Sequence, residues 1–420
     1  MYARYGASPE PPRPLCGGPP SSISREDRMS HHTRALAIAA GALLAAACSE
    51  PGAPATGPAA GTSAEASAVK FWDAGATAAW NELATALADQ TPIDAVRLYA
   101  YLSLAQFRAA EAAEATQPHP PTSAAIAGAS AVILGAFFPG QGTAIQAALD
   151  AQEAADPWPG AKHADFAAGE AMGRDIGARV LEFAAGDQVG VADPGTPPIG
   201  PGYWVWNGGP IVRGNYGARP FFLASADEFR PGPPPAFGSP AYLTALAEIR
   251  QISDTRTAEQ LDIATYWNLQ QSGRRNAVFN DLAVELIRTY RVSDAKAARI
   301  MFLMNGAVFD GLVGCFDAKY TYWFIRPPQA DPGITLPVGL PPHPSYPSAH
   351  SCVSGSASGV LRAEFPSERE RVDAAALEAS LSRLYAGIHY RFDMEAGLAL
   401  GRAVAAKAMA ADLSQVAVLP

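Results

Sequence analysis

The sequence predicts an all-α protein, a multi-helix bundle with one long loop region. Alanine dominates, apolar side chains recur every three or four positions, and β-branched runs with strict alternation are scarce. A three-to-four spacing places apolar side chains on one face of a helix, whereas strands require alternation. The chain has 420 residues, 49% of them hydrophobic. It can therefore bury one large core or two smaller ones.

The first 68 residues are expected to lie outside this fold. Residues 1–28 are rich in proline and precede Met29, so they are either untranslated or disordered. Residues 29–47 resemble a signal peptide, in which one arginine precedes thirteen apolar residues, too few to span a bilayer. Small residues before Cys48 resemble the lipobox of bacterial lipoproteins, with plain secretory cleavage as the alternative. Residues 48–68 read as a flexible linker.

These features predict an exported protein, periplasmic or at the surface of a bacterial cell, whose only membrane contact is a lipid anchor at Cys48. The folded part is expected at residues 69–420. It contains Cys315 and Cys352, which are expected to be buried free thiols. A disulfide between them is the alternative in an exported protein.

Helix signals follow along the folded part. Residues Trp72, Ala76, Trp80, Leu83 and Leu87 form an apolar stripe at helical spacing. An apolar helix is expected to end at Pro139-Gly140. Further helices are expected at about residues 257–271, 275–290, 293–318, 348–364, 371–386 and 394–414.

Two helix starts can be read from capping residues. Thr91 is expected to be an N-cap, with Pro92 at the first helical position and Asp94 in the first turn. Ser239 and Pro240 repeat this pattern.

The region from Gly186 to Gly238 interrupts the helical pattern with proline, glycine and aromatic residues. A loop of this length inside a compact domain is usually functional or disordered, and its aromatic side chains favour order. We expect it to wrap the helices and to wall the mouth of a site. Capping of the core alone is the alternative.

Three segments near the C-terminus suggest a binding site for a tetrahedral oxyanion. They read "KYTYWFIRP" with Lys319 and Arg326, "YPSAH" with Ser348 and His350, and "SRLYAGIHYRFD". Arginine offers a planar fork to oxyanion edges and lysine a point charge. Aromatic residues between Lys319 and Arg326 indicate burial, where an unpaired cation is costly, so a bound anion or a carboxylate partner is expected. Pro327 predicts that a helix ends near Arg326.

The sequence around residue 348 predicts a helix N-terminus that favours an anion. Ser348 is a suitable N-cap, and the first amides of the helix that follows have no acceptor within that helix. The positive end of the helix dipole favours an anion. Serine, alanine and glycine over the next turns allow neighbouring helices to pack closely.

The order and spacing of these residues resemble the signature of vanadium-dependent haloperoxidases and type-2 phosphatidic acid phosphatases, the PAP2 superfamily. The motif K-x6-R-P begins at Lys319, P-S-x-H at Pro347, and S-R-x5-H-x3-D at Ser382. One position departs from the pattern: Ala349 stands where the family usually has glycine. The backbone amide remains, but the methyl group could crowd the pocket.

The resemblance implies two packed four-helix bundles and a role for each matched residue. The residues expected to hold oxyanion oxygens are Lys319, Arg326, Ser348, the amide of Ala349, and Arg383. His389 is expected to be the axial ligand of vanadate in a peroxidase, or the phosphorylated nucleophile in a phosphatase. His350 is expected to be the general acid–base. Asp393 either orients His389 or only caps the last helix.

The resemblance favours a vanadate-dependent haloperoxidase that oxidises a halide, preferably bromide, with hydrogen peroxide. Similarity to bacterial haloperoxidase-like proteins extends over most of residues 69–414. His343 matches an extra active-site histidine of algal bromoperoxidases, with an ordinary loop histidine as the alternative reading. Phe316 occupies a position where fungal chloroperoxidases have tryptophan.

Two other functions stay open. One is an exported acid phosphatase that hydrolyses phosphate monoesters with phosphate in the same site, and the other is a non-catalytic oxyanion-binding lipoprotein. The expected partners are hydrogen peroxide, halide and a small organic acceptor. The formal net charge of −9 argues against nucleic acid.

Overall fold

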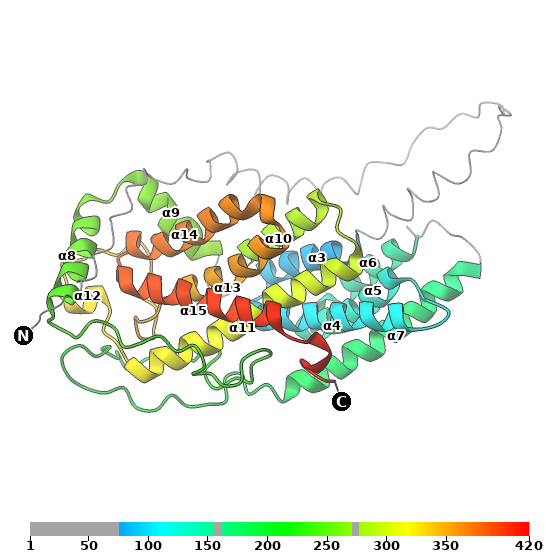
Figure 1. The fold of residues 1–420 in the computed structure, drawn as a ribbon, viewed down its shortest axis with the longest axis horizontal. Coiled ribbons are helices and arrows are strands. Elements are labelled where there is room, and N and C mark those ends of the chain that lie inside the picture. Colours follow the sequence, from blue (N-terminus) through cyan, green and yellow to red (C-terminus); the bar gives the residue numbers. More distant parts are fainter. Residues whose placement is uncertain (1–74, 155–160, 271–276, 420) are drawn as a thin grey trace, which may run out of the picture. The chain divides into compact units, whose positions relative to one another are not determined.

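The computed structural model describes residues 75–154, 161–270 and 277–419. The extension, the signal peptide, Cys48 and the linker, predicted for residues 1–68, lie outside the described residues, as does Trp72. Within the described residues the chain is all-α, which confirms the predicted fold class (Figure 1).

The elements follow one another along the chain as a series of helices. They are α3 (Ala76–Gln90), α4 (Ala95–Ala115), α5 (Thr122–Phe137), α6 (Gly142–Ala154), α7 (Ala161–Ala185), α8 (Pro240–Thr255), α9 (Ala258–Gln270), α10 (Val278–Thr289), α11 (Asp294–Tyr322), α12 (Pro327–Ala330), α13 (Ala349–Glu364), α14 (Arg369–Tyr385) and α15 (Arg391–Ala410). Short 3-10 helices occur at Pro139–Gln141, Pro366–Glu368 and Leu413–Gln415. The described residues form no strand, only an isolated antiparallel bridge between Tyr203 and Phe324.

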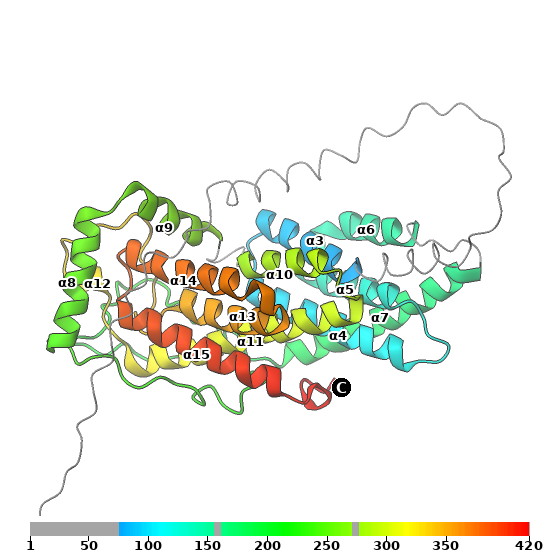
Figure 2. The same cartoon turned by 45° about the horizontal axis from the view of Figure 1, so that its top comes forward.

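The helices pack in two groups that share α11. Helices α4, α5 and α7 contact one another on one side, and α13, α14 and α15 on the other. Figure 2 shows α11 running between these groups, with α8, α9 and α12 at one end. Among the described helices α11 is the one that is long and apolar enough to cross a membrane, but most of that apolar stretch is buried by its neighbours.

The contact between α13 and α15 depends on residues without side chains. A Cβ atom at Gly401 would lie 2.3 Å from the carbonyl oxygen of Cys352, and one at Gly355 would lie 2.7 Å from that of Leu398. The two backbones therefore touch. This confirms that the small residues after Ser348 serve close helix packing.

Capping residues set two helix starts, one of them differently from the prediction. Ser239 is the N-cap of α8, and its hydroxyl accepts from the amide of Tyr242. The prediction of Thr91 as an N-cap was wrong: α4 begins at Ala95, and the Asp94 carboxylate accepts from the amide of Arg97 at 3.0 Å. The carboxylate is well placed there because it also faces the positive end of the helix dipole.

The loop between α7 and α8, residues 186–239, runs along the helices beneath α11 and α15 in Figure 1. Asp310 of α11 fixes it, because its carboxylate accepts from the amides of Phe221, Phe222 and Leu223 at 2.7–3.1 Å. Burial raises the pKa of Asp310 to about 7. The loop is thus ordered by a buried polar anchor as well as by its aromatic residues.

Candidate active site

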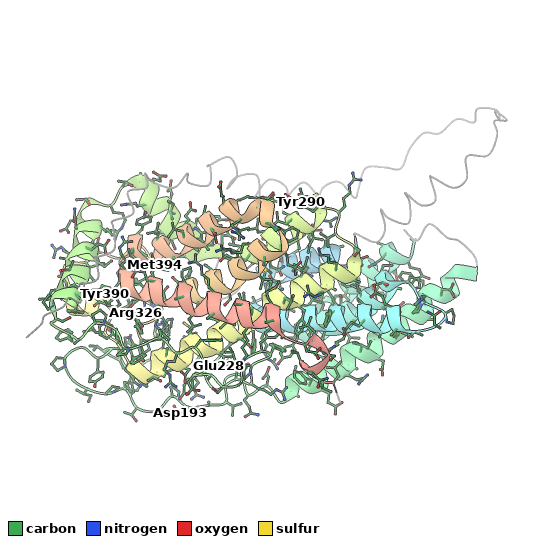
Figure 3. The ribbon with its side chains drawn as sticks, viewed as in Figure 1. Asp193, Glu228, Tyr290, Arg326, Tyr390 and Met394 are labelled. Carbon is green, nitrogen blue, oxygen red and sulfur yellow. The ribbon has the colours of Figure 1, made fainter. Side chains whose placement is uncertain are left out.

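Five parts of the chain meet at one end of the helix bundle. Lys319 lies in the last turn of α11, Arg326 follows the end of that helix, and Arg383 lies in the last turn of α14. The turn before α13 and the turn before α15 complete the group. Figure 3 shows Arg326 and Tyr390 close together near α8 and α12.

The chain reverses direction between Lys319 and Arg326. Helix α11 ends at Tyr322, and Trp323 adopts a left-handed conformation with φ 49°. Helical geometry therefore does not connect the two cations, contrary to the expectation that the helix ends near Arg326. Extended residues 324–326 carry Arg326 back towards the cluster, and Pro327 opens the short α12.

Arg326 is fully buried and bonds to two histidine rings. Its Nη1 lies 3.3 Å from His389 Nε2, and its Nη2 lies 3.0 Å from His343 Nδ1. The other guanidinium protons go to backbone carbonyls, including that of Ile388 at 2.8 Å. An arginine can only donate, so His389 Nε2 must accept. His343 Nδ1 also lies 3.2 Å from the carbonyl oxygen of Pro344, so Arg326 alone does not fix the tautomer of His343. Burial lowers the pKa of Arg326 to about 10.

Lys319 is also fully buried, and its ammonium group points at the turn before α13. Its Nζ donates to the carbonyls of Pro344 at 2.9 Å, Ser345 at 2.8 Å and Pro347 at 2.5 Å. Burial lowers its pKa to about 8. With all three donors engaged, Lys319 supplies positive charge and holds the turn. It reaches an anion directly only by releasing a carbonyl.

Arg383 completes a set of three buried cations. It donates to the carbonyl of Ala264 at 2.8 Å and to the hydroxyl of Ser382 at 2.9 Å, and burial lowers its pKa to about 9. No described carboxylate lies within 4.0 Å of Lys319, Arg326 or Arg383. The cluster therefore concentrates positive charge that one nearby acid, Asp393, only partly offsets.

His389 and Asp393 form a buried pair. The His389 Nδ1 atom lies 2.8 Å from Asp393 Oδ2, and the same oxygen accepts from the amide of Tyr390 at 3.2 Å. Asp393 thus orients His389, which was one of the two alternatives. The other, Asp393 as the N-cap of the last helix, was wrong: the N-cap of α15 is Tyr390, and Asp393 accepts from its amide from within the first turn. Since Nε2 accepts from Arg326, Nδ1 carries the proton. Burial and the charge of Arg326 hold the pKa of His389 well below its usual value.

His350 lies in the first turn of α13 and is half-buried. Its Nε2 is 3.2 Å from the carbonyl oxygen of Trp267, which can only accept, so Nε2 carries the proton and Nδ1 the lone pair. Burial and the charge of Arg383 lower its pKa well below the usual value. The ring is therefore neutral and able to accept a proton.

Ser348 occupies the N-cap position of α13, as predicted, but its hydroxyl caps nothing. The Oγ atom is buried and has no hydrogen-bond partner among the described residues. An orphan buried hydroxyl is costly and needs an explanation. At a helix N-terminus, beside the amide of Ala349, an oxyanion oxygen would satisfy it.

His343 and Phe316 lie at the edge of this cluster. The two rings are in edge contact, with centroids 5.3 Å apart, and both side chains are buried. His343 also contacts Arg326, so it belongs to the same network. All the predicted site residues are thus brought to one region, with Phe316 in its wall.

Comparisons with known proteins match the same part of the chain. Residues 299–414 match the family described as the PAP2 superfamily. This matched stretch, the PAP2 region, lies in the C-terminal part of the chain. It contains every predicted site residue, from Phe316 to Asp393. No match was found among curated protein sequences.

The fold around the PAP2 region resembles solved bacterial peroxidases. A bacterial vanadium-dependent iodoperoxidase matches with a TM-score of 0.65 and 23% identity, over 79% of this chain and 95% of that one. The holo form of a bacterial vanadium-dependent chloroperoxidase matches with a TM-score of 0.60 and 14% identity, over 74% and 90%. Its apo form matches with a TM-score of 0.56 and 14% identity, over 76% and 94%. At these identities the likeness establishes the fold.

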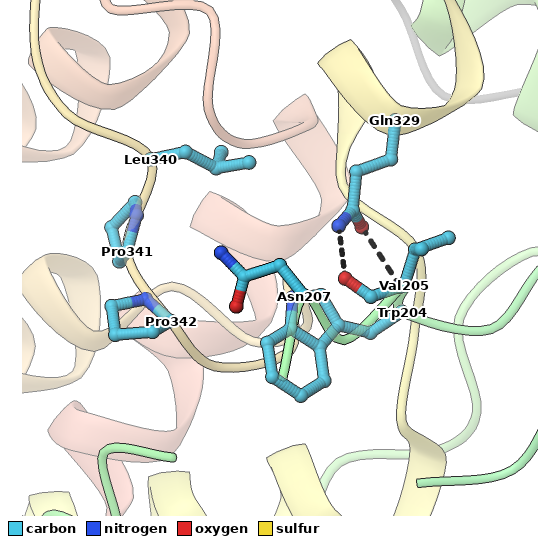
Figure 4. A pocket seen from close by; sticks show the side chains of 7 residues that line it. All are labelled: Trp204, Val205, Asn207, Gln329, Leu340, Pro341 and Pro342. Atoms are coloured by element: carbon cyan, nitrogen blue, oxygen red, sulfur yellow. Dashed lines mark hydrogen bonds between the residues drawn. The ribbon is translucent and has the colours of Figure 1, made fainter. Parts of the chain in front are cut away.

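A groove of about 300 Å³ borders the cluster of Lys319, Arg326 and Arg383 (Figure 4). It is lined by Trp204, Val205, Asn207, Gln329, Leu340, Pro341 and Pro342. Gln329 bonds both to the backbone of Val205 and, through Oε1, to the amide of Arg326 at 3.3 Å. The long loop therefore borders the site, as expected.

Cys315 and Cys352 are buried free thiols, as expected, so the alternative of a disulfide was wrong. Cys315 lies one helical turn before Lys319. Burial opposes its thiolate, but the Cys352 thiol and the Lys319 charge favour it, and together they lower the pKa of Cys315. In the PAP2 region the Cys315 sulfur packs against the carbonyl of Pro347, beneath the turn that carries Ser348.

Sequence reasoning missed Ser345. Its hydroxyl donates to Asp393 Oδ2 at 2.5 Å, and its carbonyl accepts from Lys319. The signal was present, because Ser345 stands in "HPSYPSAH" between two positions that were recognised. The carbonyl acceptors of Pro344, Pro347 and Ile388 carried no side-chain signal.

Proposed function

We propose that the protein is a vanadate-dependent haloperoxidase that oxidises a halide, with bromide favoured, to a hypohalous species using hydrogen peroxide. One observation carries the proposal. Three buried cations lie around His389, a neutral histidine whose tautomer leaves a lone pair on Nε2. A tetrahedral oxyanion with several negative charges would neutralise the cations, and its central atom would accept the lone pair.

The residues present fit vanadate. Arg326, Arg383, the Ser348 hydroxyl and the amide of Ala349 would hold its oxygens, with Lys319 supplying charge. His389 Nε2 would coordinate it. When bound, vanadate supplies an electrophilic centre that activates peroxide towards halide.

The chain's own residues hold and move protons around that group. Asp393 keeps the proton of His389 on Nδ1, so Nε2 keeps its lone pair. That lone pair accepts from Arg326 in this structure and would turn to the anion when Arg326 bonds to the anion's oxygens. His350 is neutral at physiological pH and can take a proton on Nδ1. Burial of the cations strengthens their attraction for the anion, because little water screens them.

Phosphate monoester hydrolysis is the second candidate, because residues 299–414 match a superfamily named for a phosphatase. The same cluster would then hold the phosphoryl group of the ester. His389 Nε2 would attack phosphorus as the P–O bond to the alcohol breaks and the alcohol leaves with a proton, and water would then release phosphate from His389. The likeness to peroxidases over three-quarters of the chain supports the first candidate. A third possibility, an oxyanion-binding lipoprotein without activity, has no observation in its favour.

One paired assay separates these functions. Purified protein freed of bound anions is given peroxide and bromide, with or without orthovanadate, and separately a chromogenic phosphate ester. Bromination that requires vanadate supports the proposal. Ester hydrolysis that vanadate inhibits replaces it with the phosphatase, and silence in both assays leaves the binding protein.

His389→Ala should abolish the activity that is found, since it removes the residue that would coordinate vanadate or act as the nucleophile. We expect a loss of at least about a thousandfold in kcat/KM. His119→Ala is a matched control, because His119 lies far along the chain, in the turn before α5. Normal turnover by His389→Ala would remove this residue from the mechanism.

We also propose that the protein is exported and anchored by a lipid at Cys48. Labelling of the intact cell with a palmitate analogue should mark the wild type and spare Cys48→Ser. Equal labelling of both proteins would exclude this anchor, and signal cleavage without labelling would indicate a plain secretory signal.

A further inference from the structure

Ser345 lies at the junction of three segments that carry the site. It is fully buried, between His343 and Pro347. Its amide donates to the carbonyl of Phe324 at 2.9 Å, and its carbonyl accepts from Lys319 Nζ at 2.8 Å. These bonds fix the backbone of Ser345 against α11 and the stretch before Arg326.

The hydroxyl of Ser345 reaches a fourth segment. It donates to Asp393 Oδ2 at 2.5 Å, the oxygen that also accepts from His389 Nδ1 at 2.8 Å. The amide of Tyr390 makes a third bond to Oδ2 at 3.2 Å. Asp393 Oδ1 is buried and has no partner among the described residues. The three donors therefore all bond to Oδ2, and none bonds to Oδ1.

We propose that Ser345 is a positioning residue for His389. By holding Asp393 Oδ2 at one place, it keeps the proton of His389 on Nδ1 and the lone pair of Nε2 directed at the oxyanion. This inference rests on the proposed use of His389 Nε2, and applies equally to a peroxidase and a phosphatase.

The physical reason is that Asp393 Oδ1 has no donor, so rotation of the carboxylate can bring hydrogen bonds to that oxygen. Without the Ser345 hydroxyl, Oδ2 keeps two of its three donors, and rotation would let Oδ1 share them. The bond to His389 Nδ1 would weaken, and the Nε2–H tautomer would become populated. A protonated Nε2 repels the cationic side chain of Arg326 and cannot bind the central atom.

The experiment compares Ser345→Ala with Ser380→Ala. Ser380 is equally buried, but its hydroxyl bonds only to the carbonyl of Ala376 in α14. Chain labelled with ¹⁵N-histidine reports the His389 tautomer by proton–nitrogen correlation, and the signal is assigned by its loss in His389→Gln. Calorimetry with orthovanadate reports anion affinity, and thermal unfolding reports the fold.

Ser345→Ala should give a mixed His389 tautomer and about a tenfold weaker affinity for orthovanadate, while Ser380→Ala keeps both at wild-type values. An unchanged tautomer in folded Ser345→Ala would overturn the proposal. If that variant does not fold, Ser345→Gly, which also removes the hydroxyl donor, takes its place with the same criteria. Because the tautomer is read without turnover, this result is independent of whether the protein oxidises halide.

Discussion

Arg326 contacts two histidines through one side chain. Its guanidinium lies 3.3 Å from His389 Nε2 and 3.0 Å from His343 Nδ1. His389 Nε2 accepts from it, and His389 Nδ1–H donates a hydrogen bond to Asp393 Oδ2. His343 Nδ1 also lies 3.2 Å from the carbonyl oxygen of Pro344, and its ring packs edge-on against Phe316. The same arginine therefore selects the tautomer of His389 and connects His343 to the site.

The orphan hydroxyl of Ser348 leads to a prediction in which binding and stability separate. Ser348→Ala should weaken orthovanadate affinity about tenfold, because it removes one bond to a charged oxygen. The free energy of unfolding without anion should stay equal or rise, since a buried unpaired hydroxyl is removed. Calorimetry and urea unfolding measure the two quantities.

Ser358→Ala is the matched control for this prediction. Ser358 is equally buried in α13, but its hydroxyl faces the carbonyl of Gly355. Its replacement should leave anion affinity unchanged. A loss of affinity in both variants would show that the effect comes from α13 as a whole.

Lys319 should make anion binding depend on pH. Burial lowers its pKa to about 8, and only the protonated form attracts an anion. The affinity for the anion is therefore highest below pH 8, where Lys319 is protonated. It should fall as the pH rises through 8, by up to about tenfold per pH unit. Molybdate is a suitable probe, since it stays a dianion in this range.

Lys319→Met tests the origin of that dependence. Its affinity should be low at every pH and lack the decline above pH 8, whereas Lys296→Met, at an exposed position on the same helix, should behave as wild type. A decline that persists in Lys319→Met would assign it to another group.

At the scale of helices, close backbone contact decides where side chains are tolerated. Gly401→Ala would place a Cβ atom 2.3 Å from the carbonyl oxygen of Cys352 and 2.6 Å from the amide of Ser356. The clash should lower the free energy of unfolding by about 1–3 kcal/mol. This loss is larger than the stabilisation expected from the higher helix propensity of alanine.

Gly135→Ala is the opposite case. Gly135 lies in α5, and a Cβ atom added there would meet no other atom within 4 Å. Alanine should therefore stabilise the protein by about 0.5–1 kcal/mol. Urea unfolding of both variants measures the difference. Equal destabilisation would contradict the role given to the α13–α15 contact.

Helix positions were largely predictable, and the exceptions have physical causes. The sequence offered both Thr91 and Asp94 as caps, and only the tertiary structure selects Asp94. Helix α7 was not predicted because Gly169, Gly173 and Gly177 weaken a helical pattern. The structure uses Gly173 to bring α7 against α5, where a Cβ atom would lie 1.9 Å from the carbonyl oxygen of Ala125.

At the scale of the whole molecule, motif spacing predicted which side chains meet but not how their donors are used. Lys319 and Arg326 donate most of their hydrogen bonds to backbone carbonyls. Every residue has a backbone carbonyl, so the sequence does not show which of them will accept. The hydrogen bonds that the amides of residues 221–223 donate to Asp310 could not be predicted for the same reason. Long-range bonds to backbone depend on the finished fold.

The surplus positive charge of the site makes a last prediction about the whole fold. An anion that binds only the folded state stabilises it by mass action, about 2.7 kcal/mol at a hundredfold excess over Kd. For a domain of this size that corresponds to a rise of roughly 3–4 °C in Tm. Orthovanadate or phosphate should give this shift in calorimetry.

Nitrate at equal ionic strength is the control, because it is planar and carries one charge. It should leave Tm unchanged, since it can neither bridge Arg326 and Arg383 nor offset the charge of three buried cations. Arg383→Met should lose the phosphate-induced shift, because one of the cations is gone. An equal rise with nitrate, or a full shift in Arg383→Met, would mean that general salt effects stabilise the fold and that the cluster is not an oxyanion site.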